Sequence, residues 1–348
     1  MQQVLHLFGL YYAYVVKTLL FLFDTNHRLY ALYLLTALPF AYWVYRQTQR
    51  QSEDAEDRGF VAFLFPKEVW SHPSAWLDVR YFFFHTLIGH FLLASTFVAT
   101  QAWGYTLVTG GANLAETTVA GERVLTRYDY LIALIYMIIV VAVADFTAWF
   151  THMLQHKVPI LWEFHKVHHS AEVMHPVSNY REHPVDNLFY LVMIGSTYGI
   201  SLGLAVTMFG YIPTTPMVLG IPLIGFLFNI VGYNLRHSHI WLRWPGVWSK
   251  VFPSPAHHHV HHSCHPDHWD KNFAFMFPLW DVIFGTYEMP EDNRDVKFGV
   301  TGVKHGEMDS CLKLYYVPFK KAFARLKKRK APSPQPNAAE NQALRNRA

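Results

Sequence analysis

The sequence predicts an all-α, polytopic membrane protein, a bundle of spanning helices with a helical cap on its cytoplasmic side. Three observations lead to this fold class. Long apolar runs recur along the chain, charged residues are scarce, and histidines gather in three spaced clusters between and after the runs. Because the histidines of each cluster have the spacing of one helix face, the cap is expected to be helical as well.

The composition argues against an ordinary soluble protein. Hydrophobic residues make up 52% of the 348 residues and charged residues only 16%, against roughly 25% charged in soluble domains. A run of about 20 apolar residues can cross a bilayer as a helix. Six runs are candidates: Val4–Phe23, Leu29–Tyr45, Tyr81–Trp103, Tyr130–Phe150, Leu188–Ile212 and Pro216–Tyr233. The first run lacks a basic leading segment and a small-residue cleavage site, so we expect it to be retained rather than removed as a signal peptide.

The positions of Lys and Arg predict the orientation of the bundle, because cytoplasmic loops carry an excess of both. The stretch Arg46–Arg58 has three arginines, and Lys313–Lys330 has eight basic residues and no acidic one. With six spans, both termini are then cytoplasmic. The segments 151–187 and 235–348, which hold the histidine clusters, are expected on the same side.

The C-terminal region and the cysteines add smaller expectations. Phe319, Phe323 and Leu326 lie at helical spacing in the basic stretch, which predicts a surface helix, either against anionic lipid headgroups or in solvent. Residues 331–348 are expected to be disordered. Two cysteines, Cys264 and Cys311, on the predicted cytoplasmic side, make a structural disulfide, an iron–sulfur cluster and a cysteine-rich zinc site improbable. We find no nucleic-acid-binding motif.

The histidines are unevenly distributed. Of 22 histidines, 16 lie between His152 and His268. They include one HxxxH segment, His152-Met-Leu-Gln-His156, and two HxxHH segments, His165-Lys-Val-His168-His169 and His258-His-Val-His261-His262. Residues three and four apart share one face of a helix. Each segment therefore directs two or three imidazoles toward one point.

Imidazole is a good ligand for iron, zinc and copper. The three segments offer eight ring ligands, whereas one tetrahedral zinc needs at most four. Eight ligands imply two metals close together or two separate zinc sites. Since the clusters flank the same membrane face, we favour one shared site with two metals. Histidines that stand alone, such as His6, His27 and His72, are interpreted as ordinary polar residues.

The order HxxxH, HxxHH, HxxHH, interleaved with membrane spans, resembles the fatty acid hydroxylase/sterol desaturase superfamily. The resemblance covers roughly 145–287. It is supported by Trp162-Glu-Phe-His-Lys-Val-His-His-Ser170, Arg181-Glu-His-Pro184, Asn234-Leu-Arg-His-Ser-His239 and Trp280-Asp-Val-Ile-Phe-Gly-Thr286. It implies three regions: N-terminal membrane helices at 1–127, a di-iron catalytic domain at 128–290, and a basic C-terminal region with a disordered tail at 291–348.

The resemblance also implies a set of metal ligands for two iron ions. The candidates are His152, His156, His165, His168, His169, His183, His237, His258, His261 and His262. His239, His257 and His259 are weaker candidates. His175, His265 and His268 are expected around the site or on the surface. His85 and His90, five apart in the third run, either line a substrate cavity or satisfy each other.

Several other polar residues are candidates for supporting roles. Asp145 lies seven residues before His152 on one helix face, and an acid in a membrane span is costly and usually functional. It is expected to orient a ligand imidazole. Asn234 is expected to hydrogen-bond a metal-bound water or a ligand. Ring N–H groups of so many ligands need acceptors, for which Glu163, Glu182, Asp186, Asp270 and Asp281 are candidates.

The reaction that the resemblance implies is hydroxylation of a lipid C–H bond, with O2 as co-substrate. Such chemistry requires a metal rather than a side chain. The sequence has no flavin, nicotinamide or haem-domain signature, so a separate electron donor is expected: a reductase, a ferredoxin or a cytochrome. The basic C-terminal stretch could dock an acidic donor.

Three alternatives stay open at this point. A desaturase would use the same di-iron centre. A membrane zinc hydrolase is disfavoured because the chain has no HExxH and too many ligands. A non-catalytic scaffold is disfavoured because all three histidine segments are intact. The substrate can be a sterol, a fatty acyl chain or an ether lipid, and the location a bacterial inner membrane or, alternatively, the endoplasmic reticulum.

Overall fold

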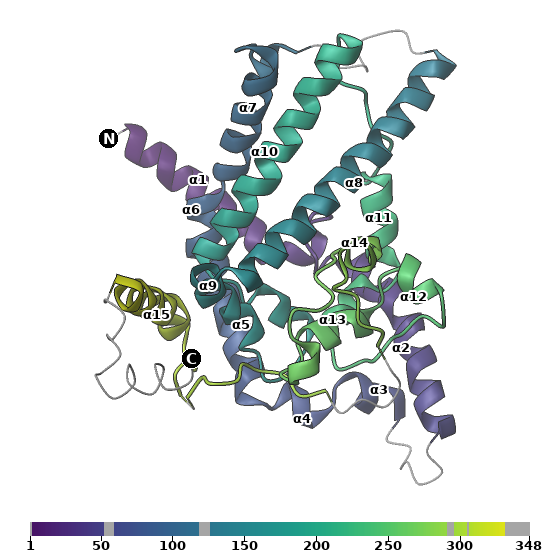
Figure 1. The fold of residues 1–348 in the computed structure, drawn as a ribbon, viewed down its shortest axis with the longest axis vertical. Helices are drawn as coiled ribbons and strands as arrows, with labels where there is room; N and C mark the ends of the chain where they lie inside the picture. Colours follow the sequence, from purple (N-terminus) through teal and green to yellow (C-terminus); the bar gives the residue numbers. More distant parts are fainter. Residues whose placement is uncertain (1, 52–58, 118–125, 291–295, 305, 331–348) are drawn as a thin grey trace, which may run out of the picture.

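Helices dominate the computed structural model, which describes residues 2–51, 59–117, 126–290, 296–304 and 306–330. Helices α7, α8 and α10 extend together toward one end of the molecule, and most of the other helices gather at the opposite end (Figure 1). Within the described part, the strands are β1 (Met217–Val218) and β2 (Ile221–Pro222), which pair antiparallel with Val218 opposite Ile221. The prediction of an all-α fold is confirmed.

The helices and strands follow one another along the chain in this order. The N-terminal part contains α1 (Gln2–Leu19), η1 (Phe21–Phe23), α2 (Ala31–Gln51), α3 (Gly59–Leu64), α4 (Lys67–Trp70), α5 (Pro73–His85), the π-helical η2 (Thr86–His90), α6 (Phe91–Leu93), α7 (Thr96–Thr109) and η3 (Leu114–Glu116). The remainder contains α8 (Arg127–Lys157), α9 (Pro159–His169), η5 (Pro176–Tyr180), α10 (Pro184–Phe209), α11 (Leu223–Ile230), η6 (Tyr233–His237), α12 (Trp248–Val251), α13 (Pro255–His261), η7 (Pro266–His268), α14 (Leu279–Phe284) and α15 (Cys311–Lys330).

Three helical stretches in the described part are long and apolar enough to cross a membrane: Pro73–Thr109, Arg127–Lys157 and Pro184–Phe209. They correspond to the third, fourth and fifth apolar runs of the sequence. Much of the apolar surface of α8 is exposed, through Leu131, Leu134, Ile135, Ile138 and Ile139. Exposed apolar side chains along a spanning helix are what a lipid environment requires.

The prediction that Pro216–Tyr233 forms a sixth spanning helix is wrong. The segment folds into the β1–β2 hairpin and the eight-residue helix α11, and eight residues rise only about 12 Å. Proline at 216 and 222 and Gly220, at φ +78°, interrupt helical hydrogen bonding. The expected orientation rested on six spans and stays a prediction.

Small residues bring α7 and α10 into close contact. Gly195, Gly199 and Gly203 recur every fourth residue on α10, and Gly104 lies opposite on α7. A Cβ at Gly199 would collide with the backbone carbonyl of Gln101, and one at Gly104 with that of Ser196. Such stripes let the backbones of membrane helices approach. The stripe aligns α10, whose first turn reaches the histidine clusters.

The shorter helices form a cap with its own apolar core. Leu77 and Tyr81 of α5, Val167 of α9, and Leu314 and Val317 of α15 form one buried cluster. The helix predicted in the basic C-terminal stretch is present as α15, and it packs against α9. Its outer face carries exposed apolar side chains, including Phe323 and Leu326. The tail predicted to be disordered, 331–348, lies outside the described residues.

Candidate metal centre

The structure gathers nine histidines into two groups. The ring nitrogens that each group offers all lie within 4.8 Å of one another. The five-histidine group consists of His152, His156, His165, His169 and His261. The four-histidine group consists of His168, His237, His258 and His262. No carboxylate or cysteine belongs to either group, so the donors are all imidazole nitrogens.

Local chain geometry places these rings. Helix α8 extends to Lys157, so His152 and His156 lie one turn apart on its last two turns. Val158 is extended and Pro159 begins α9, which turns the chain back toward α8. Proline suits the first position of a helix, because a backbone N–H at that position would have no partner within the helix. Helix α13 also begins at a proline, Pro255, after Ser254 at its N-cap.

The two HxxHH helices each contribute to both groups. On α9, His165 and His169 belong to the five-histidine group and His168 to the other. On α13, His261 belongs to the five-histidine group, whereas His258 and the adjoining His262 belong to the four-histidine group. The groups are therefore neighbours, and the rings of His169 and His262 stack at a centroid distance of 4.3 Å.

In four of the nine histidine rings, the nitrogen that points away from the group has a hydrogen-bond acceptor. In each case Nδ1 is the bonded atom. The partners are the carbonyl of Phe273 for His152 (2.8 Å), Asp186 for His165 (2.9 Å), the carbonyl of Lys271 for His261 (2.8 Å) and the Ser178 hydroxyl for His237 (3.1 Å). An Nδ1–H held in this way leaves Nε2 unprotonated and free to bind a metal.

Several of the inward nitrogens are buried without a hydrogen-bond partner. They are Nε2 of His156, His165, His169, His261 and His262, and Nδ1 of His168. Each unsatisfied buried polar atom costs roughly 1–3 kcal/mol. Six such atoms converging in two adjacent groups fit bound metal ions, because each nitrogen then gains a bond. Imidazole donor sets suit iron, zinc, copper and nickel.

Burial keeps these imidazoles neutral, as metal binding requires. Loss of hydration lowers the pKa of His168, His258 and His262 well below the ordinary value, and neighbouring imidazoles lower it further. Burial lowers the pKa of His261 to about 3. At neutral pH these rings therefore present lone pairs rather than positive charge.

His183 is the one predicted ligand that lies in neither group. Its Nε2 bonds to the carbonyl of Tyr315 at 2.9 Å, and its Nδ1 accepts from the Val185 N–H at 3.1 Å. Pro184 occupies the first turn of α10, and His183 is the N-cap of that helix. Both ring nitrogens are thus used by the backbone.

Asp145 and Asn234 are placed differently from what the sequence suggested. Asp145 accepts from the N–H groups of Met276 and Phe277 and from the indole of Trp280. It ties α8 to the loop before α14 and bonds to no ligand imidazole. Asn234 is buried and stands three residues before His237 in the chain. Its Nδ2 has no hydrogen-bond partner among the described residues, so its role stays a prediction.

Of the five other acids, two lie beside ligands. Asp186 bonds to His165 and accepts from Gln155 at 2.6 Å, and Asp270 lies 3.8 Å from Nδ1 of His156. The remaining acids have other partners. Glu163 pairs with Lys166 and Arg325, Glu182 with Asn187 and Arg28, and Asp281 with Trp149 and the loop at 273–274.

The weaker histidine candidates lie outside both groups. His239 bonds to the carbonyl of Phe63 and His257 to Ser254, and the ring of His259 packs against that of Trp241 at 5.5 Å. His175, expected around the site or on the surface, is buried and bonds to Asp78. His85 bonds to Tyr315 and Asn187, and the rings of His85 and His90 meet at 4.4 Å. The contacts of His85 therefore agree with the interpretation that it is a structural residue rather than a metal ligand.

A buried ion pair that the sequence did not reveal supports the four-histidine group. Asp78, fully buried on α5, pairs with Arg181 and with His175. Arg181 also donates to the carbonyls of Ser74 and Ser170. These contacts fix the turn η5, from which Ser178 reaches His237. Asp78 and Arg181 are about 100 residues apart in the chain, so their spacing in the sequence does not predict the ion pair.

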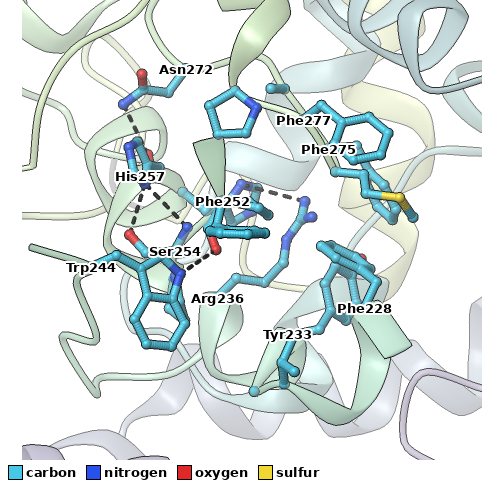
Figure 2. Close-up of a pocket in the computed structure, with 18 of the residues that line it drawn as sticks. Phe228, Tyr233, Arg236, Trp244, Phe252, Ser254, His257, Asn272, Phe275 and Phe277 are labelled. Carbon is cyan, nitrogen blue, oxygen red and sulfur yellow. Dashed lines mark hydrogen bonds between the residues drawn. The ribbon is translucent and has the colours of Figure 1, made fainter. Parts of the chain in front are cut away.

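Two cavities reach the histidine groups. A polar cavity of about 690 Å³ is lined by His152, His165, His168 and His258, together with charged side chains from α1, from the connection between η1 and α2, from the start of α10 and from η6. An apolar cavity of about 510 Å³, shown in Figure 2, lies between α11, α12 and the loop at 272–278. Arg236, His258 and Phe275 line both cavities.

The fold and the site define a membrane-embedded helical protein with two adjacent all-histidine groups suited to metal ions. Residues 137–286 match the family model described as fatty acid hydroxylase. This region of the chain is therefore similar to the fatty acid hydroxylase family, in agreement with the resemblance that the histidine segments indicated.

Named relatives match between 149 and 165 residues of the chain. The chain is 28% identical to ornithine lipid hydroxylase OlsE of Rhizobium tropici over 165 residues, covering 46% of this chain and 44% of that protein. It is 27% identical to human alkylglycerol monooxygenase, covering 45% and 31%, and 31% identical to human cholesterol 25-hydroxylase, covering 41% and 46%. The matches span less than half of each of these relatives. No solved structure gives a significant match.

Proposed function

We propose that the protein is a membrane-bound, non-haem di-iron oxygenase that hydroxylates a C–H bond of a lipid, using O2 and external electrons. The observation that carries the proposal is the pair of adjacent all-histidine groups joined by α9 and α13. Support comes from the relatives, whose names describe hydroxylases and monooxygenases of lipids and of cholesterol.

The two groups would hold one iron each. His152, His156, His165, His169 and His261 would bind the first, and His168, His237, His258 and His262 the second. Bound iron supplies what side chains lack, the activation of O2 for insertion of an oxygen atom into a C–H bond. Two zinc ions would fit the same donors, but zinc has no redox chemistry.

The residues of this chain would then orient the ligands and the substrate. Asp186, held by Gln155, fixes the ring of His165, and Ser178 fixes that of His237. The polar cavity gives a substrate direct access to both groups, since His152 and His258 line it. Side chains such as Phe97, Phe273 and Phe275 bound the same cavity and would limit the water beside the reacting carbon.

The placement in the membrane is part of the proposal. We infer that the cap faces the cytoplasm because α15, with its Lys- and Arg-rich end, packs on the cap. A bacterial inner membrane or the endoplasmic reticulum would both provide this arrangement. A reductase, a ferredoxin or a cytochrome would deliver electrons from that side. A desaturase would use the same centre, and its product would lack two hydrogens rather than gain an oxygen.

The test is iron content together with turnover of the purified full-length protein. We expect two irons per chain, one for each group, and O2-dependent addition of one oxygen atom to a component of a lipid extract when a reductant is supplied. His168→Ala and His261→Ala should each lose iron and turnover. His239→Ala, a histidine outside both groups, is the matched control and should keep both.

Three results would count against the proposal. Zinc in place of iron, with no O2 consumption after iron reconstitution, would favour the hydrolase alternative. Unchanged turnover in His168→Ala or His261→Ala would show that the histidine groups are not the site of the reaction. Loss of two mass units without gain of oxygen would assign the desaturase reaction instead.

A further inference from the structure

Arg236 occupies the boundary between the two cavities. It lies on η6, next to His237, and its guanidinium packs over the rings of Tyr233 and Phe275, each at 4.8 Å from its carbon Cζ. The side chain points into the apolar cavity, among aromatic residues (Figure 2). A positive charge in such surroundings is unusual, because burial of a charge is costly without a partner.

The other charges that line the polar cavity have partners. Lys17 pairs with Asp24 at 3.2 Å, and Arg28 lies 3.8 Å from Glu182. Asp186 is engaged by Gln155 and His165. These contacts engage the three acids of the cavity, Asp24, Glu182 and Asp186, and among the described residues none of the three forms an ion pair with Arg236.

Arg236 itself has no acidic partner among the described residues. Its one hydrogen-bond contact is a long one, 3.4 Å from a terminal nitrogen to Nδ1 of His258, and its Nε is buried without a partner. The two aromatic faces offset part of the desolvation cost. An arginine stays protonated in proteins, so the charge is present whether or not a partner is.

Metal binding would remove even the contact with His258. The Nε2 atoms of His258 and His237 face each other at 2.7 Å, inside the four-histidine group. If Nε2 of His258 binds the metal, its Nδ1 carries the proton and can only donate. Arg236 and His258 would then present N–H donors to each other, which calls for an acceptor oxygen between them.

The apolar cavity indicates what else the ligand contains. Its walls include Leu227, Phe228, Trp244, Trp248 and Phe252, and its size falls within the usual range of ligand pockets. Leu227, Trp248 and Phe252 are about half exposed, so the rim of the cavity is itself apolar. A hydrocarbon chain matches these walls, and an anionic oxygen matches the donors at the base.

We propose that Arg236 and the Nδ1–H of His258 bind an anionic group, a carboxylate or a phosphate, of a lipid substrate whose hydrocarbon tail occupies the apolar cavity. This inference rests on the proposed function, because it assumes that His258 binds a metal. It narrows the substrate class from lipids in general to anionic lipids. It also places the polar end of the lipid, rather than its tail, beside the four-histidine group.

The test compares binding of three radiolabelled probes to the iron-loaded, full-length protein in detergent: oleate, methyl oleate and oleoyl lysophosphatidate. A charged hydrogen bond is worth roughly 1.5–3 kcal/mol, about ten- to a hundredfold in affinity. We expect at least one anionic probe to bind about tenfold tighter than the ester. Whichever anion prevails identifies carboxylate or phosphate as the group recognised.

Variants assign the preference to Arg236. Arg236→Gln should remove the difference between anion and ester, and Arg236→Lys should keep part of it. Arg127→Gln removes an exposed arginine that also stacks on an aromatic ring, that of Tyr128, and should behave as wild type. Iron is measured in every sample, so a loss of the metal site is distinguished from a loss of anion binding.

Two outcomes would overturn the inference. Equal affinity of the wild type for all three probes, with iron present, would exclude an anion site and leave the proposed function intact. A preference for anions that persists in Arg236→Gln would assign the site to other residues. If the wild type prefers anions but holds no iron, the proposed function fails while the cation–anion contact stands.

Discussion

The two histidine groups differ in how firmly the protein holds their rings. In the five-histidine group, three imidazoles bond through Nδ1 to fixed acceptors: the carbonyls of Phe273 and Lys271 and the carboxylate of Asp186. In the four-histidine group, His237 alone has such an acceptor among the described residues, the hydroxyl of Ser178. The first group is therefore the better preorganised site.

The comparison shows that one histidine group has the more firmly held rings, whereas the other is reached by both cavities. The four-histidine group contains His258, which lines both cavities, and its outer nitrogen faces Arg236 rather than an acceptor. The more firmly held group would keep its metal, and the less firmly held one is the group that both cavities reach. Variants that act on one group and not the other can break or sharpen this comparison.

The largest effect is expected from Asp78→Asn. The change leaves Arg181 buried without its carboxylate partner, and breaking a buried ion pair costs roughly 3–5 kcal/mol. The free energy of unfolding in a denaturant titration should fall by that amount. Because Arg181 fixes η5, the four-histidine group should lose its iron first.

The matched control is Asp309→Asn, which removes the acid of a surface pair with Lys313, at 2.7 Å and 57% side-chain exposure. Exposed pairs contribute at most about 1 kcal/mol. Equal destabilisation by the two variants would contradict the structural role given to Asp78.

An intermediate effect is expected from Asp186→Asn. The carboxylate orients His165, and loss of such a partner typically costs about 10- to 100-fold in metal affinity or activity. Iron in the five-histidine group should be released at correspondingly lower chelator concentration, with the four-histidine group little changed. Asp267→Asn, an acid with 86% side-chain exposure, should leave both irons in place. Loss of iron mainly from the four-histidine group would reverse the assignment.

The smallest effect is expected from Ser178→Ala. It removes one neutral acceptor from the Nδ1–H of His237, worth about 1 kcal/mol or roughly fivefold in affinity. Chelator titration should show the shift in the four-histidine group alone. Ser201→Ala, whose hydroxyl bonds within α10 to the carbonyl of Thr197, provides the control. A shift as large as that of Asp186→Asn would mean that the two groups are held equally.

Histidine spacing indicated which rings lie close together, because helix periodicity converts spacing into direction. Residues three and four apart share one face, and the eight histidines of the three segments lie in the two groups, together with His237, which the family resemblance indicated. His183 lacks such spacing, and Pro184 after it makes the position a helix N-cap. The partition of each HxxHH segment between two groups depends on how α9 and α13 pack, which spacing does not encode.

Other features of the site could not be predicted from the sequence, for physical reasons. The carbonyls of Phe273 and Lys271 hold ligands through backbone atoms, which leave no trace in side-chain identity. Arg236 stands within a stretch that resembles the family, but its lack of an acidic partner is a property of three-dimensional neighbours. The Gly195, Gly199 and Gly203 stripe was visible in principle, as a small-residue repeat in an apolar run.

The order in which the ligands leave the ribosome has a consequence for assembly. His152 precedes His262 by more than a hundred residues, and α10 and the β1–β2 hairpin lie between them in the chain. Neither histidine group is complete until α13 has been synthesised, because each takes at least one ring from it. If the groups bind iron as proposed, neither ion can gain its full set of ligands until α13 has been synthesised, and the nascent chain holds imidazoles that do not yet share a metal.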